Sequence, residues 1–194
     1  MDSYKLAVKL FVENPGDFKT EDFIPVFHRW IQTRALDGHQ LIDVADYGHV
    51  HQGPGTVLVS HEANIHADTE GGRLGLFYIR KYTIEGSFAN RLKVVFTNAL
   101  KAASLLEKEP AFAGKIKFRT DEALFQINDR LNAPNTTQTF AQVTGDLNAF
   151  LQKLYGGASV DLIYHPDPQR LFEVGIRASQ SVPLGTLLDR VATV

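Results

Sequence analysis

Cysteine is absent from the 194 residues of this chain, and methionine and tryptophan occur once each. The lack of cysteine excludes disulfides, thiolate nucleophiles, iron–sulfur clusters and cysteine-ligated zinc, and it fits a reducing compartment. Long apolar runs are missing too, because no stretch approaches the roughly 18 residues of a membrane span and Lys5 and Lys9 interrupt the apolar N-terminal segment. We therefore predict a cytoplasmic protein without membrane partners.

An excess of charge of one sign is also missing. The chain has 20 Lys and Arg against 22 Asp and Glu, a formal net charge of −2. A general nucleic-acid binder needs a basic surface to neutralise phosphates, so we predict no nucleic-acid partner. The hydrophobic fraction of 44% and the charged fraction of 22% are typical of globular proteins. The length suits one domain over residues 1–194, with a possible subdivision into 1–84 and 85–194.

Alternating and continuous apolar runs predict strands over residues 5–13, 39–46, 55–61 and 74–82. The last three are expected to form an antiparallel meander. Between the first two, apolar residues at helical spacing predict a helix over residues 23–36, which Asp37 and Gly38 end.

Two longer amphipathic helices are predicted around Phe88–Leu106 and Phe140–Leu154, with Ser87 and Thr136 or Thr137 as caps. Each precedes a predicted hairpin. The first joins residues 115–119 to 123–128 around Thr120, Asp121 and Glu122, and the second joins 159–165 to 171–178. A short helix over residues 184–191 closes the chain.

These elements predict an α+β protein whose mostly antiparallel sheet carries three long helices on one face. Residues 74–165 have the order β-α-β-β-α-β, which is compatible with a ferredoxin-like unit. Two half-sheets that face each other are the alternative. The last predicted strand carries Leu171, Phe172, Val174, Ile176 and Ala178, which we interpret as apolar residues on both faces. A second copy of the chain would cover that surplus, so we expect self-association.

Histidine is distributed unevenly, since five of the seven histidines fall between positions 39 and 66. His49 and His51 share one side of an extended segment, and a hairpin would bring them toward Glu62 or His66. Two imidazoles and a carboxylate suit a divalent transition metal. The candidate metal ligands are therefore His49, His51 and His66, and the wider candidate ligand-binding set is His49, His51, His61, Glu62 and His66. Ordinary loop histidines, with His61 at a strand end, are the simpler interpretation.

Two glycine-containing segments are further candidates. Gly53-Pro54-Gly55 is typical of a tight turn, and it could also let a ligand approach the backbone. The segment from Gly71 to Gly75 lacks the Gly-Lys-Ser/Thr ending of a phosphate-binding loop and precedes a strand, so neither nucleotide motif is present.

No complete catalytic constellation is visible in the sequence. We therefore expect a self-associating α+β module that binds a small molecule or acts in assembly. The alternative is a metal-assisted enzyme that uses the histidine-rich hairpin over residues 49–66.

Overall fold

The structure, a computed structural model, describes residues 5–51 and 53–194. In this part of the chain, eight strands form one antiparallel sheet in the order β2-β3-β4-β5-β1-β6-β8-β7. The strands are β1 (Leu6–Val12), β2 (Leu41–Asp46), β3 (Thr56–Ser60), β4 (Ala63–Asp68), β5 (Gly75–Arg80), β6 (Phe118–Ile127), β7 (Val160–Ile163) and β8 (Phe172–Ala178). The α-helices are α1 (Ile24–Thr33), α2 (Phe88–Glu107), α3 (Thr137–Leu154) and α4 (Leu184–Thr193). Short 3₁₀ turns are η1 (Thr20–Phe23), η2 (Glu70–Gly72) and η3 (Pro110–Phe112).

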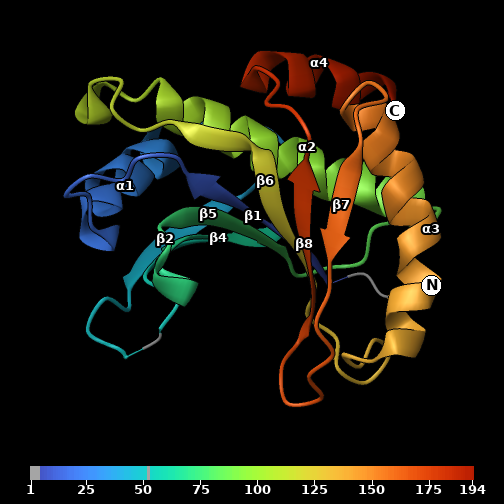
Figure 1. The fold of residues 1–194 in the computed structure, drawn as a ribbon. Helices are drawn as coiled ribbons and strands as arrows, with labels where there is room; N and C mark the ends of the chain where they lie inside the picture. Colours follow the sequence, from blue (N-terminus) through green and yellow to red (C-terminus); the bar gives the residue numbers. More distant parts are fainter. Residues whose placement is uncertain (1–4, 52) are drawn as a thin grey trace.

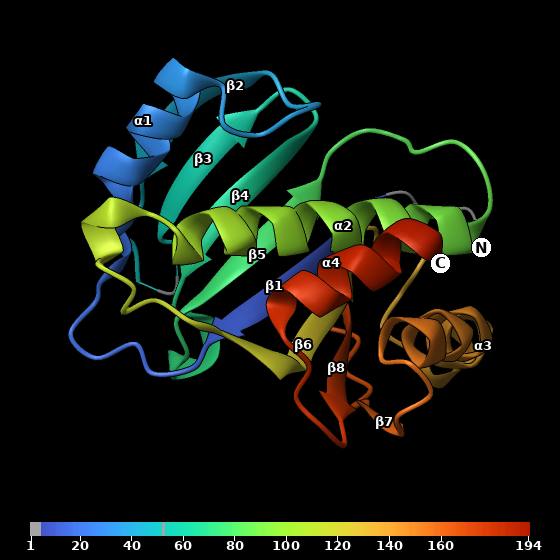
Figure 2. The same ribbon diagram turned by 90° about the horizontal axis from the view of Figure 1, so that it is seen from above.

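The four α-helices cover one face of the sheet (Figures 1 and 2). Figure 2 shows α2 and α4 lying side by side across the central strands, with α3 beside β7 at one end. The caps predicted for the two long helices are present, because the Ser87 and Thr136 hydroxyls accept the Asn90 and Thr139 backbone N–H groups. The sheet is strongly twisted, and β6 and β8 cross the direction of β4 and β5 (Figure 1).

The two faces of the sheet have different chemistry, as the central strand β1 illustrates. Leu6, Val8, Leu10 and Val12 join the apolar core beneath the helices. The intervening side chains, Ala7, Lys9 and Phe11, lie outside this core cluster, on the face that carries no helix. We call this second surface the helix-free face. It carries most of the polar features described below.

The first predicted hairpin is wrong. Residues 118–127 form the single strand β6, with Thr120, Asp121 and Glu122 inside it. The pairing of β6 with β1 shifts between Leu10 and Val12, so the polar segment is an irregularity in the ladder and not a turn. Residues 74–165 therefore follow the order β-α-β-α-β, and the ferredoxin-like order is not confirmed.

The α+β class and the antiparallel sheet are confirmed, but the three long helices are not. Two helices are long, with 20 residues in α2 and 18 in α3, whereas α1 and α4 have ten residues each. Strand β4 was not predicted as a separate strand, because Asn64, His66 and Asp68 interrupt its apolar pattern. Strands from residues 1–84 and from residues 85–194 belong to the same sheet, since β1 pairs with both β5 and β6.

The interpretation of β8 as apolar on both faces is wrong. Phe172, Val174, Ile176 and Ala178 all belong to the helix-covered core, whereas Glu173, Gly175 and Arg177 alternate with them. This periodicity of two places the polar residues on the helix-free face. The second predicted hairpin, β7 with β8, is confirmed. None of the described helices has the length and apolar character required to span a membrane.

Candidate functional site

The five predicted site residues occupy three separate places on the β2–β4 meander. His49 and His51 are exposed in the loop over residues 47–55, between β2 and β3. His61 and Glu62 form the turn between β3 and β4, at the opposite end of β3. His66 lies within β4, where it pairs in register with Val57 of β3 and Phe77 of β5.

The local contacts of these residues differ accordingly. The His61 ring stacks on Tyr82 with ring centroids 4.7 Å apart, and the Glu62 carboxylate accepts the Gln40 backbone N–H at 2.8 Å. Within residues 5–51 and 53–194, no group of three or more His, Asp or Glu side chains could hold a metal ion. The structure therefore does not bring His49, His51 and His66 together as a ligand set.

His66 is nevertheless unusual among the histidines. Burial lowers the pKa of its imidazole to about 4, so the ring is neutral at pH 7. Its Nε2 atom is buried without a hydrogen-bond partner, and so is Oδ1 of Asn64, two residues earlier in β4. Both side chains lie on the helix-free face, among Val57, Phe77 and other apolar neighbours.

A buried ion pair crosses the same face. Lys9 of β1 and Asp68 of β4 are 1% and 2% exposed, and the Lys9 ammonium pairs directly with the Asp68 carboxylate. Strand β5 lies between β1 and β4, so the Lys9 side chain passes over it. The strand has Gly75 at this crossing, where a Cβ atom would lie 2.6 Å from Cε of Lys9. Glycine at this position therefore makes room for the ion pair.

The ion pair also fixes the turn η2. Asp68 Oδ1 accepts the Glu70 backbone N–H at 2.9 Å, and Nζ of Lys9 donates to the Glu70 carbonyl at 3.2 Å. Burial raises the pKa of the Asp68 carboxyl, while the neighbouring ammonium opposes that shift. The turn is thus tied to the centre of the sheet.

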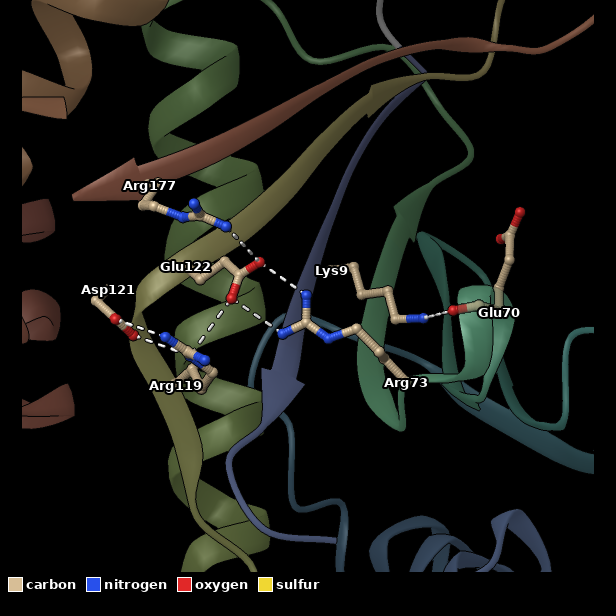
Figure 3. A network of polar contacts seen from close by, with 7 residues as sticks. All are labelled: Lys9, Glu70, Arg73, Arg119, Asp121, Glu122 and Arg177. Atoms are coloured by element: carbon tan, nitrogen blue, oxygen red, sulfur yellow. Dashed lines mark hydrogen bonds and ion pairs between the residues drawn. The ribbon is translucent and has the colours of Figure 1, made fainter. Parts of the chain in front are cut away.

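Beside this pair, three guanidinium groups converge on Glu122 (Figure 3). Arg73 binds its carboxylate with two hydrogen bonds of 2.7 and 3.0 Å, and Arg119 and Arg177 lie 3.4 and 4.0 Å from it. Hydrogen bonds from Arg73 hold the pKa of Glu122 below its ordinary value. Arg119 also pairs with Asp121 at 2.7 Å.

These charges balance one another. Every cation of the cluster has a carboxylate partner, and Arg170 similarly pairs with Glu173 at 3.1 Å and with Glu70 at 3.7 Å. The guanidinium groups are partly exposed, so each pair contributes at most about 1 kcal/mol. The three guanidinium groups around Glu122 exceed its carboxylate and that of Asp121 by one charge, which Glu70 and Glu173 around the single Arg170 offset.

A cavity of about 640 Å³ opens next to this network. One wall is the loop over residues 47–55 and the other is the segment 69–72, which contains η2. Arg170, from the connection between β7 and β8, and Thr20 of η1 complete the described lining. Segments that are far apart in the sequence therefore meet around one hollow of the size that small ligands occupy.

The walls of this cavity are held in place by backbone contacts. The loop is closed by the hydrogen bond from Tyr47 N–H to the Gly55 carbonyl at 2.8 Å. Within it, the Val50 N–H donates to the Tyr47 carbonyl and the Gly53 N–H donates to the Val50 carbonyl, each at 2.9 Å. Gly55 has a φ of +67°, and a Cβ atom there would lie 2.1 Å from the Ala67 carbonyl oxygen. The last turn of this loop ends at Gly53 and does not span Gly53-Pro54-Gly55, and both glycines line the cavity.

Two smaller hollows extend from the cavity along the helix-free face. The first, of about 180 Å³, shares Glu70, Gly71 and Arg170 with the cavity. The second, of about 250 Å³, shares Phe11, Leu124 and Glu173 with the first. The shared residues place the three hollows next to one another, as a groove that runs from the 47–55 loop toward β7.

One feature of the sequence, the position of Lys9, predicts a buried charged pair on this surface. Lys9 is a single charge in the apolar segment that becomes the central strand, and a charged residue there needs a buried partner. Its partner Asp68 and the guanidinium groups around Glu122 are 59 or more residues away from Lys9, so local patterns could not identify them.

Comparison of the chain with protein-family models, with curated proteins and with solved structures gives no match.

Proposed function

We propose that this protein binds a small polar molecule, without covalent chemistry, in the cavity between the 47–55 loop and the segment 69–72. The observation that carries the proposal is the cavity itself, whose 640 Å³ lie within the range of small-ligand sites. Its walls are fixed before a ligand arrives, by the loop hydrogen bonds on one side and by the Lys9–Asp68 pair on the other. A preformed site loses little conformational entropy on binding.

A thermal-shift screen of polar metabolites tests this function. A ligand that binds only the folded state raises its stability by about 2.7 kcal/mol at a concentration of 100 times Kd. We expect at least one compound to raise the melting temperature of the native chain and to have no effect on Thr69→Trp, which places a large ring among the residues that line the cavity. Thr83→Trp, an exposed position away from the cavity, is the matched control.

The screen contradicts the proposal if no compound stabilises the chain, or if the same compounds stabilise Thr69→Trp and the native chain equally. The second result would place the binding site elsewhere.

Self-association is a second candidate function, favoured by strand β2. This strand is at the edge of the sheet, and its Ile42 side chain is 55% exposed. An exposed edge strand with an apolar side chain can pair with a second copy of the chain. Asp43 and Asp46, also in β2, oppose such pairing through charge repulsion.

The metal-assisted enzyme would need ligands beyond those that the described residues bring together. Small-molecule binding requires only the cavity and its lining, so the geometry favours it.

A further inference from the structure

We infer that the ligand of this cavity is a polyhydroxylated, sugar-like molecule, an inference that rests on the proposed function. It follows from the charge, the hydrogen-bonding groups and the aromatic surface of the described lining residues.

The charge of the lining argues against strongly ionic ligands. Glu70 and Arg170 are the charged side chains among the described residues that line the cavity, and they lie 3.7 Å apart. Glu70 repels an anion near Arg170, and Arg170 repels a cation near Glu70. A neutral ligand meets neither repulsion.

The hydrogen-bonding groups of the lining suit hydroxyls. The hydroxyls of Thr20 and Thr69 can donate and accept, the Glu70 carboxylate accepts, and the Arg170 guanidinium donates. Five glycines, at positions 48, 53, 55, 71 and 72, also place backbone near the cavity without side chains in between. A ligand hydroxyl both donates and accepts, so it can use every one of these groups.

The apolar surface is small and lies in the 47–55 loop. Tyr47 and Val50 line the cavity, and their side chains are 42% and 43% exposed. A large apolar ligand would cover the threonine hydroxyls and the Glu70–Arg170 pair without offering them hydrogen bonds in place of water, at a cost in free energy. A sugar ring has C–H groups on its faces, and these can pack on the Tyr47 ring while its hydroxyls contact the polar groups.

Saturation-transfer NMR with maltose, cellobiose and myo-inositol tests the inference, with glutamate and putrescine as anionic and cationic probes. We expect transfer to the protons of at least one polyol and a weaker effect on either ionic probe. The Tyr47→Ala variant removes the aromatic contact and should lower the affinity about three- to tenfold, because aromatic contacts contribute about 0.5–1.5 kcal/mol. Tyr47→Phe keeps the ring and should retain binding.

Matched controls separate the cavity from general surface effects. Tyr82 is 51% exposed and does not line the cavity, so Tyr82→Ala should bind like the native chain. Arg170→Met should weaken polyol binding, whereas Arg34→Met, at an exposed position after α1 that does not line the cavity, should not.

Two results would overturn the ligand class. One is binding of glutamate or putrescine in the cavity when all three polyols fail, which would leave the proposed function intact. The other is equal polyol binding by native chain and Tyr47→Ala. If the thermal-shift screen also finds no compound that stabilises the native chain without stabilising Thr69→Trp, the proposed function fails together with this inference.

Discussion

Lys9 and Asp68 form a buried ion pair although a complete strand, β5, separates the strands that carry them. Both residues are at most 2% exposed, and the same carboxylate also accepts the Glu70 backbone N–H. Taking two charges out of water is costly unless each finds its partner, so loss of one member should be severe. The pair determines where the turn η2 lies and therefore shapes one wall of the cavity.

We expect Lys9→Met to lower the free energy of unfolding by about 3–5 kcal/mol, because it leaves the Asp68 carboxylate buried without a cation. The double variant Lys9→Met/Asp68→Asn should recover part of this loss, since it removes the unpaired charge. Urea unfolding measures both. Lys117→Met is the control, because the Lys117–Glu107 pair is exposed and should contribute less than about 1 kcal/mol. A loss of similar size for Lys9→Met and Lys117→Met would contradict the role given to the buried pair.

Gly75 should be intolerant of a side chain for the same reason. A Cβ atom there would lie 2.6 Å from Lys9 Cε and 2.8 Å from the Leu10 carbonyl oxygen. We expect Gly75→Ala to destabilise the fold by about 1–3 kcal/mol through overpacking. Gly145→Ala in helix α3 is the matched comparison, because a Cβ atom there meets no atom within 4 Å. That substitution should stabilise the chain by about 0.5–1 kcal/mol, as measured by thermal unfolding. Equal effects at the two sites would refute the steric explanation.

The buried imidazole of His66 should make stability depend on pH. The pKa of the ring is about 4 in the folded chain against an ordinary 6.5, so the unfolded chain binds more protons between these values. Stability should therefore rise from pH 4 to pH 6.5 and level off above. At about 1.4 kcal/mol per tenfold change in proton affinity, this residue contributes at most about 3.5 kcal/mol.

Urea titrations of the native chain and of His66→Gln at several pH values isolate this contribution, because His39, whose pKa is also lowered, stays in both proteins. The native chain should lose more stability than the variant on acidification. Parallel curves would mean that the His66 imidazole titrates normally.

Self-association through β2 predicts a mass of two chains in light scattering at high concentration. Ile42→Asp adds a third acidic residue to the edge strand and should restore the single chain. Leu131→Asp, at a position that is 89% exposed and outside the strands, should leave the mass unchanged. A single chain at every concentration would remove this candidate function.

Periodicity in the sequence was enough to predict the helices around Phe96 and Leu147 and the β7–β8 hairpin, because apolar spacing and caps are local signals. It failed at β6, where Asp121 and Glu122 resemble a turn, because the partners of Glu122 include Arg73, from the segment before β5, and Arg177 of β8. It also failed at β4, where three polar residues face the buried Lys9 side of the sheet. Partners that are distant in the sequence decided both cases.

The sequence predicted separate segments of the candidate site but not that they meet. Both glycine segments were recognised as candidates, but their meeting around a cavity depends on the pairing of β3 with β4. Arg170 lines the cavity from the connection between β7 and β8, which are strands at the other end of the sheet. The histidines drew attention to the right loop, while the described lining of the cavity consists of its neighbours Tyr47, Gly48, Val50, Gly53 and Gly55.

Backbone amide NMR of the labelled chain, titrated with the strongest stabilising compound from the screen, tests the binding site most directly. The predicted result is a saturable shift of the amides of Gly48, Gly53, Gly55 and residues 69–72, with the amides of α2 and α3 unmoved. Saturable shifts that cluster elsewhere, around His61 and Tyr82 for example, with unchanged amides at residues 69–72, would contradict binding in this cavity.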